Sequence, residues 1–251
     1  MSNKNFQIYS KYYNLLYGDK NYRAESNYVA GNIKKYIPDA KSILEFGSGT
    51  GGHGILLQKK GFAVFGLDQS EYMAEEAKKK GLPCMVSDIS NFKLNERFDV
   101  VVSLFHVISY LTTNEKLVST FLNANKHLNK GGIFLFDVWY SPAVYEQKAV
   151  PRIKKMQNQE IAIIRVADPK IHINANIVDV RYTIITKDLS NNEVNELFES
   201  HPMRHFSIPE IELLAKLTDF EVVKVEEFLT ADEPSEKTWG VCFILKKNIN
   251  I

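Results

Sequence analysis

Residues Ile43 to Gly54 read I-L-E-F-G-S-G-T-G-G-H-G, and this stretch decides the fold. An apolar run carries the acid Glu45 near its end, five glycines follow between positions 47 and 54, and a helical pattern begins at Ile55. Glycine lacks a Cβ, so it permits positive φ and lets another molecule approach the backbone closely. A strand, a glycine turn and a helix start in this order form a binding corner for a nucleotide-like ligand.

Two ligands fit the glycine spacing equally well. Gly47-x-Gly49-x-x-Gly52 matches a dinucleotide fingerprint, and Gly47-x-Gly49-x-Gly51 matches an S-adenosylmethionine (SAM) loop. Glu45, two residues before the first glycine, would repel a pyrophosphate and attract the ammonium and sulfonium of SAM. We therefore predict SAM as cofactor and S-adenosyl-L-homocysteine as its product. A tight turn that binds no ligand is the alternative, and so many glycines disfavour it.

Acids follow the next two predicted strands. Asp68 lies 21 positions after Gly47, where a carboxylate can accept hydrogen bonds from ribose hydroxyls. The alternative is that Asp68 only caps the helix that starts near Ser70. Asp88 can accept a hydrogen bond from an adenine amino group while the amide of Ile89 donates to a ring nitrogen, or Asp88 can be a solvated turn residue.

Strands and helices alternate along the first part of the chain. This order predicts an α/β fold with a parallel, doubly wound sheet. The predicted strands are 41–46, 62–67, 83–87, 97–105 and 133–139, and the predicted helices are 25–36, a helix that includes 55–60, 71–80 and 114–128.

After Tyr140 the pattern changes to strands without intervening helices. They are predicted at 160–166, 171–186 and 194–206, with turns at Asp168-Pro169 and at 188–192. We therefore expect an antiparallel β insertion after strand 5. A helix at 208–216 and strands at 220–229 and 238–246 follow. The predicted domains are a core with an N-terminal flap (1–150), the insertion on the acceptor side (151–206) and a C-terminal part that completes the sheet (207–251).

Together these features resemble the class I SAM-dependent methyltransferases, with their Rossmann-like sheet. The matching segments are E-F-G-S-G-T-G at 45–51, G-L-D-Q-S at 66–70, S-D-I at 87–89, F-D-V-V-V-S-L-F at 98–105 and L-N-K-G-G at 128–132. A narrower resemblance, to the dTDP-amino-sugar N,N-dimethyltransferases of the desosamine and mycaminose type, rests on the insertion and on Y-Y-N-L-L-Y at 12–17, D-K-N-Y-R-A-E at 19–25 and S-L-F-H-V-I-S-Y-L at 103–111. That family usually has Asp at the positions of Asn14 and Glu45.

The resemblance and the residues together give a predicted cofactor site and a predicted acceptor site. Tyrosines near the N-terminus either pack on the core or form a flap over the cofactor. The predicted cofactor-binding residues are Tyr17, Tyr22, Glu45, Gly47, Ser48, Gly49, Asp68, Gln69, Asp88, Ile89 and Leu104. The predicted catalytic residues are His106, Tyr110 and Tyr13, and the predicted substrate-binding residues are Phe105, Arg165, Arg181 and His201.

The predicted function is SAM-dependent N-methylation of a dTDP-linked amino-deoxy sugar. His106 follows strand 4, where it can take a proton from an amine, although a lone histidine is more often a packing residue. The arginines suit a pyrophosphate, or else they lie on a solvated face. No Asn/Asp-Pro-Pro-Tyr/Phe motif follows strand 4, which argues against methylation of amides or DNA bases. The alternatives are another small amine or hydroxyl acceptor and, from a different class, a NAD-binding oxidoreductase or a regulator.

Composition and net charge limit the kinds of partner that we expect the protein to bind. The 251 residues carry a net charge of +1, so no basic field favours a nucleic acid. The chain has two cysteines, and we see no apolar segment long enough for a membrane span, no signal peptide and no metal-ligand spacing. We therefore expect a cytoplasmic protein, a monomer or homodimer, with a small-molecule partner and no metal.

Overall fold

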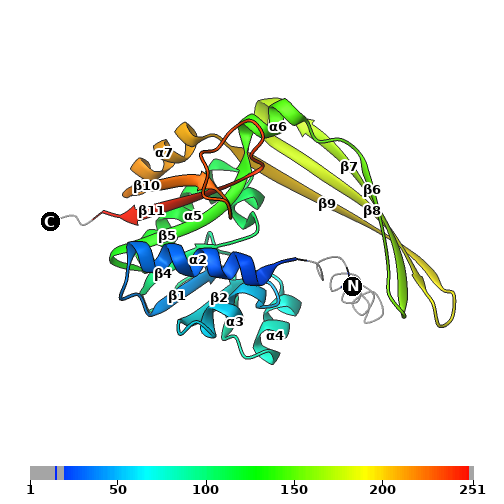
Figure 1. Ribbon diagram of the computed structural model, residues 1–251, viewed down its shortest axis with the longest axis horizontal. Coiled ribbons are helices and arrows are strands. Elements are labelled where there is room, and N and C mark those ends of the chain that lie inside the picture. Colours follow the sequence, from blue (N-terminus) through cyan, green and yellow to red (C-terminus); the bar gives the residue numbers. More distant parts are fainter. Residues whose placement is uncertain (1–14, 16–19, 249–251) are drawn as a thin grey trace. The chain divides into compact units, whose positions relative to one another are not determined.

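The computed structural model describes residues 15 and 20–248 (Figure 1). Contacts divide these residues into two compact units. One comprises Tyr22–Gln147 together with the chain from Arg204 onward, and the other is built mainly from Lys148–Met203. The division into the segments 1–150, 151–206 and 207–251 stays a prediction.

The first unit contains the parallel sheet, and it confirms the predicted α/β fold. Strands β3, β2, β1, β4 and β5 lie side by side in that order and are parallel; β11 pairs antiparallel with β5, and β10 with β11. Their bounds are β1 Ser42–Phe46, β2 Ala63–Asp68, β3 Cys84–Val86, β4 Phe98–Ser103, β5 Leu128–Tyr140, β10 Phe220–Glu227 and β11 Gly240–Lys247.

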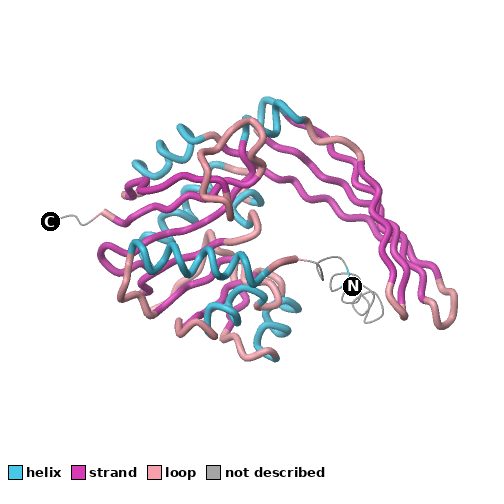
Figure 2. The backbone as a smooth tube through the Cα atoms, in the orientation of Figure 1, coloured by secondary structure: helices cyan, strands magenta, loops and turns pink. Residues whose placement is uncertain are grey.

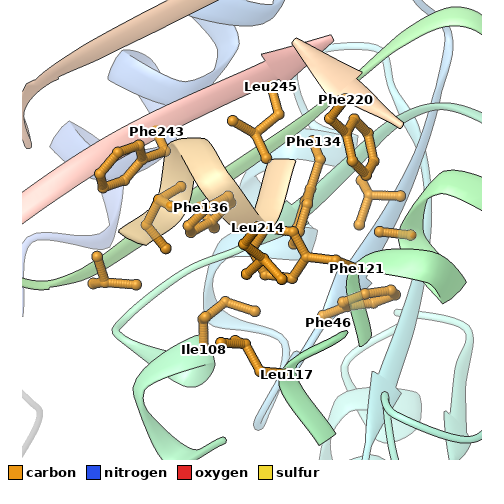
Figure 3. Close-up of a cluster of buried hydrophobic side chains, with 14 of the residues drawn as sticks. Phe46, Ile108, Leu117, Phe121, Phe134, Phe136, Leu214, Phe220, Phe243 and Leu245 are labelled. Atoms are coloured by element: carbon orange, nitrogen blue, oxygen red, sulfur yellow. The ribbon is translucent and has the colours of Figure 1, made fainter. Parts of the chain in front are cut away.

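Helices cover both faces of this sheet, because successive strand residues point to opposite sides. In β1, Ile43 packs with α2 (Tyr22–Tyr36), α3 (Gly52–Gln58) and α4 (Glu71–Lys79), whereas Leu44 and Phe46 pack with α5 (Asn114–His127) and α7 (Ile208–Leu217). Figure 3 shows the second cluster, in which aromatic rings from β1, α5, β5, β10 and β11 meet. The central strands are thus buried on both faces, which fixes where their carboxyl ends lie.

The second unit is an antiparallel sheet, as predicted. It consists of β6 (Arg152–Gln157), β7 (Ile161–His172), β8 (Ile177–Asp188) and most of β9 (Val194–Phe206). Figure 2 shows these strands as long magenta stretches of the backbone tube, joined by short connections. The register of β7 on β8 is continuous from Ile161 opposite Asp188 to His172 opposite Ile177.

The predicted turn at Asp168-Pro169 is wrong, because β7 continues through both residues and turns only at the short helix η2, Ile173–Ala175. The strand tolerates Pro169 because β6 reaches only as far as Ala167, so β7 has one partner strand at the proline. Strand β6 and the helix α6 (Ser141–Gln147) were not predicted.

Strand 4 is also shorter than predicted. It ends at Ser103 rather than Phe105, and Phe105 and His106 both have left-handed backbones, with φ of 66° and 60°. The 3₁₀ helix η1, Val107–Tyr110, follows. No helix in the described part of the chain is long and apolar enough to cross a bilayer.

Candidate active site

The glycine loop lies between β1 and α3, and two of its glycines face different surroundings. Gly47 has φ of 67°, and a Cβ there would lie 2.5 Å from Cγ2 of Val107. Gly49 has φ of 53°, and a Cβ there would meet no atom within 4 Å. The loop therefore packs directly on η1 at Gly47 and is open at Gly49, where a ligand can approach the backbone.

Asp68, at the end of β2, is tied to this loop. Its Oδ2 accepts a hydrogen bond from Gly49 N at 2.8 Å, and its Oδ1 accepts one from Ser70 N at 2.9 Å. The side chain of Ser70, rather than Asp68, caps α4 by accepting from Met73 N. Burial raises the pKa of Asp68, against these two hydrogen bonds. Each oxygen keeps a further lone pair, and the predicted cofactor residue Gln69 lies beside it, exposed.

Glu45 lies beneath the loop with only 1% of its surface exposed. Burial, and secondly the charge of Asp68, raise the pKa of Glu45 to about 8, against an opposing hydrogen bond from the backbone of Gly54. Its Oε2 is buried without a hydrogen-bond partner among the described residues. A buried carboxyl oxygen without a partner is costly, so a cationic ligand group at this position would be stabilising.

The predicted adenine residues lie at the end of β3. Asp88 Oδ1 accepts hydrogen bonds from the amide and the hydroxyl of Ser90 at 2.8 and 2.7 Å, and its Oδ2 lies 3.6 Å from Lys116 Nζ. Ile89 is buried, and its carbonyl accepts a hydrogen bond from Asn123. The carboxylate of Asp88 is therefore already engaged, and an adenine would have to share it with Ser90.

Two other predicted cofactor residues are buried against the protein. The hydroxyl of Ser48 lies 3.2 Å from Sγ of Cys84, so its side chain is directed toward β3. Leu104, after β4, is only 2% exposed. Tyr22 at the start of α2 lies against the glycine loop: a Cβ on Gly52 would be 2.5 Å from its Cε1. Tyr13 and Tyr17 lie outside the described residues.

His106 is paired with a carboxylate that the sequence reasoning missed. Its Nδ1 lies 2.7 Å from Oδ2 of Asp137, and its backbone amide donates to both carboxylate oxygens at 3.2 and 3.3 Å. Asp137 belongs to β5 and is 1% exposed. At this distance the carboxylate places a negative charge beside the ring, although Nδ1 is not aligned for a hydrogen bond with any described residue. Because Val107 contacts Gly47, this pair is linked to the glycine loop by one residue.

Three aromatic residues near His106, in sequence or in space, complete this part of the site. Phe105 is 38% exposed and Tyr110 is 46% exposed. The rings of Trp139 and His106 meet edge to face, with centroids 6.2 Å apart. The predicted catalytic histidine thus has aromatic surroundings, with a buried acid behind it.

The predicted acceptor residues of the second unit lie on both faces of its sheet. Arg165 pairs with Ile184 and Arg181 pairs with Asp168, so the two arginines point to opposite sides. The Arg165 guanidinium lies 4.6 Å above the ring of Tyr182, and His201 meets the same ring at 5.4 Å. Arg181 instead binds Asp179 on the other face at 2.9 Å. The structure thus groups Arg165 with His201 and separates Arg181 from both.

A second missed group lies below the glycine loop. His53 and Glu25 are both buried, and their side chains lie 2.6 Å apart. One signal was available for Asp137, which lies within the apolar stretch 133–140: an ionisable residue there is rarely buried unless it has a partner. Glu25 and His53 lie in polar and glycine-rich sequence and carried no such signal. The sequence did not give the partner in either pair, because the groups that meet are 28 and 31 residues apart.

Proteins of similar sequence are methyltransferases. A family described as a methyltransferase domain matches residues 43–132. The dTDP-3-amino-3,4,6-trideoxy-alpha-D-glucopyranose N,N-dimethyltransferase of Streptomyces venezuelae is 30% identical over 178 residues, which cover 68% of this chain and 74% of that protein. The Bacillus subtilis protein YqeM is 28% identical over 228 residues, which cover 87% of this chain and 89% of that protein. Its name describes a methyltransferase and states no acceptor.

The solved structures show the same fold. A SAM-dependent methyltransferase from Clostridium acetobutylicum superposes with a TM-score of 0.82 at 19% identity and covers 98% of this chain and 100% of that one. The described residues also suit SAM as cofactor: Gly49 is open, Glu45 has a free acceptor oxygen, and Asp68 keeps lone pairs for hydroxyl groups. The chain belongs to the class I SAM-dependent methyltransferases and resembles their dTDP-amino-sugar N,N-dimethyltransferases.

Proposed function

We propose that this methyltransferase acts on the amino group of a nucleotide-linked amino-deoxy sugar, with dTDP as the nucleotide. The observation that carries the proposal is the His106–Asp137 pair, which adjoins the glycine loop through Val107 and offers a proton acceptor. The Streptomyces venezuelae relative, whose name states a dTDP-amino-sugar acceptor, supports the same substrate class. We infer that the acceptor site also uses Tyr110 and Phe105.

The cofactor supplies an electrophilic methyl group, and its sulfur leaves as a neutral thioether, so the protein has no leaving-group charge to stabilise. Its residues have two other tasks. Glu45, Gly49, Asp68 and Asp88 would hold the cofactor in line with the acceptor, which provides the rate gain of proximity. Nε2 of His106 would take the proton that an acceptor ammonium must lose before its lone pair can react, and Asp137 would stabilise the resulting imidazolium.

The acceptor can be tested directly. Purified protein is incubated with SAM and one of three acceptors: a dTDP-amino-deoxyhexose, the same nucleotide sugar with a hydroxyl in place of the amine, and the free amino sugar. We expect the first to gain one methyl and then a second by mass spectrometry, and the other two to stay unchanged. Methylation of the hydroxy sugar alone would make the enzyme an O-methyltransferase and overturn the proposal.

The role of His106 gives a second test. His106→Gln should lower kcat about 100- to 10,000-fold near neutral pH, the usual range for loss of a general base. The loss should shrink at higher pH, where the acceptor amine is already deprotonated, and S-adenosylhomocysteine affinity should stay unchanged. His127→Gln is the matched control, because His127 is buried on α5. A pH-independent loss would mean that His106 only shapes the pocket.

A second candidate function is methylation of another small amine or hydroxyl. The relative from Bacillus subtilis favours it, because it covers more of this chain than the sugar methyltransferase does and its name states no acceptor. If all three sugars are inert, a wider panel of small amines and hydroxy compounds tests this candidate with the same mass readout.

A further inference from the structure

Three ionisable side chains meet beneath the glycine loop. Glu25 comes from α2, Glu45 from the end of β1 and His53 from α3. They are 8%, 1% and 6% exposed, so all three are more than nine-tenths buried. His53 lies between the two acids: its Nε2 is 2.6 Å from Glu25 Oε2, and its Nδ1 is 3.9 Å from Glu45 Oε1.

This geometry fixes the side of the imidazole that can accept a proton. The hydrogen bond with the Glu25 carboxylate places the ring proton on Nε2. Nδ1 then presents its lone pair toward Glu45. Gly54 allows this approach, because a Cβ there would lie 2.5 Å from Glu45 Oε2.

Glu45 itself keeps its proton in the ligand-free protein at neutral pH, since burial raises its pKa to about 8. The other ionisable groups around the cluster are Tyr22, Asp68 and Cys84. Among the described residues, His53 is the only basic side chain within ion-pair distance of Glu45. His53 is therefore the one basic group placed to receive a proton from Glu45 among the described residues.

We propose that the Glu25–His53 pair takes the proton of Glu45 when the cofactor binds. The O–H bond of Glu45 breaks and an N–H bond forms at Nδ1 of His53. The Glu45 carboxylate can then accept a hydrogen bond from the cofactor ammonium, while the imidazolium lies between two carboxylates. His53 and Glu25 are thus positioning residues that let a buried acid ionise without losing a proton to solvent. The inference rests on SAM binding at this loop and is independent of the acceptor.

The proposal predicts how affinity depends on pH. An internal transfer keeps the number of bound protons constant as long as Glu45 is protonated in the free protein. Affinity should therefore stay nearly level from about pH 6.5 up to about pH 7.5 and fall only about fourfold by pH 8.5, where a pKa of about 8 leaves Glu45 largely ionised. Without the acceptor, the proton must leave to solvent. For a pKa of about 8, binding at pH 6.5 would then be about 30-fold weaker than at high pH, with close to one proton released.

Calorimetric titration with S-adenosylhomocysteine at pH 6.5 and 8.5 tests this. Phosphate and Bis-Tris, which both buffer at pH 6.5 and differ in ionisation enthalpy, report the number of protons released there. Wild type should release close to none at pH 6.5, and His53→Asn should release close to one and recover affinity at pH 8.5. Glu45→Gln should bind weakly with a flat pH profile. Any titration of the ligand itself is common to all variants and cancels in their comparison.

The control is His127→Asn, because His127 is also a buried histidine with both ring nitrogens hydrogen-bonded, to Asn123 O and Leu94 N. It should behave as wild type. Release of one proton by the wild-type protein at pH 6.5 would overturn the proposal, and so would a folded His53→Asn protein with the wild-type profile. If His53→Asn does not fold, the wild-type proton count alone decides. Failure of the sugar assay leaves this outcome untouched, because the readout is binding.

Discussion

The glycine-loop region and the antiparallel sheet of residues 148–203 hold polar side chains in different ways. At the loop, the half-buried Asp68 is tied to backbone amides, those of Gly49 and Ser70. On the antiparallel sheet, polar side chains pair with side chains of neighbouring strands, as Arg165 does with Tyr182. A side chain that is hydrogen-bonded to the backbone cannot move unless the chain moves with it. A side chain on a strand face can be substituted without a change in the chain. We infer that the first arrangement suits an invariant cofactor and the second a variable acceptor.

The strongest test of this difference is Gly47→Ala. The new Cβ would lie 2.5 Å from Val107, and its positive φ adds strain, so the loop must shift. We expect S-adenosylhomocysteine affinity to fall about 100-fold or more, since overpacking and strain together cost roughly 3–4 kcal/mol. Gly81→Ala is the matched control, with φ of 94° and no atom within 4 Å of the new Cβ. We expect this control variant to lose stability but to keep the wild-type affinity. Wild-type affinity in Gly47→Ala would show that the loop is adaptable.

Glu45→Gln tests the buried acid through stability. The native pKa of about 8 is above the unfolded value, so the native state holds a proton that the unfolded chain loses. The stability that this proton confers is complete below pH 4.5 and is lost as pH rises toward 8 and above. At pH 9 the amide variant should therefore be more stable than wild type by about 2–4 kcal/mol, and at pH 4.5 nearly equal.

Urea unfolding at the two pH values measures this, and Glu75→Gln is the control because Glu75 is exposed on α4. An equal gain at both values would point to packing instead of ionisation.

Asp68→Ala should weaken S-adenosylhomocysteine binding by about 1.5–3 kcal/mol, the scale for hydrogen bonds to a charged group. Calorimetry measures it. Ser70→Ala is the control, because Ser70 provides the cap of α4. It should cost about 1 kcal/mol of stability and leave binding unchanged. If both variants bind equally well, Asp68 has only a structural role.

The smallest effect is expected on the antiparallel sheet, where the two arginines should differ. We expect Arg165→Ala to raise the acceptor KM about tenfold, the scale of one charge-assisted hydrogen bond, and Arg181→Ala to change it less than about twofold. Their opposite orientations are the reason. Steady-state kinetics with saturating SAM measures both. Equal effects would contradict the assignment of one face to the acceptor.

The same comparison explains which features the sequence could predict. Glycine spacing and the acids near the ends of β1 and β2 specify local geometry, so the predicted cofactor residues follow from a few adjacent positions. The alternation in β7 and β8 predicts strands, but the face that each arginine occupies depends on the register, which the pairing of distant residues sets. Pro169 was misread for this reason. The partners of His106 and His53 depend on contacts between separate elements, so Asp137 and Glu25 needed the structure.

Phe105 and His106 carry one more consequence. Consecutive left-handed residues without glycine store conformational energy, roughly 1–2 kcal/mol for each residue. The rest of the domain sustains that cost at the turn that presents the proposed base. Selection for heat resistance alone would favour glycine at these two positions, and each such exchange would remove a side chain that we propose for the acceptor site. Thermal stability and catalytic activity therefore make opposite demands on this turn. We expect directed evolution toward thermostability to leave these two residues unchanged when activity is also selected.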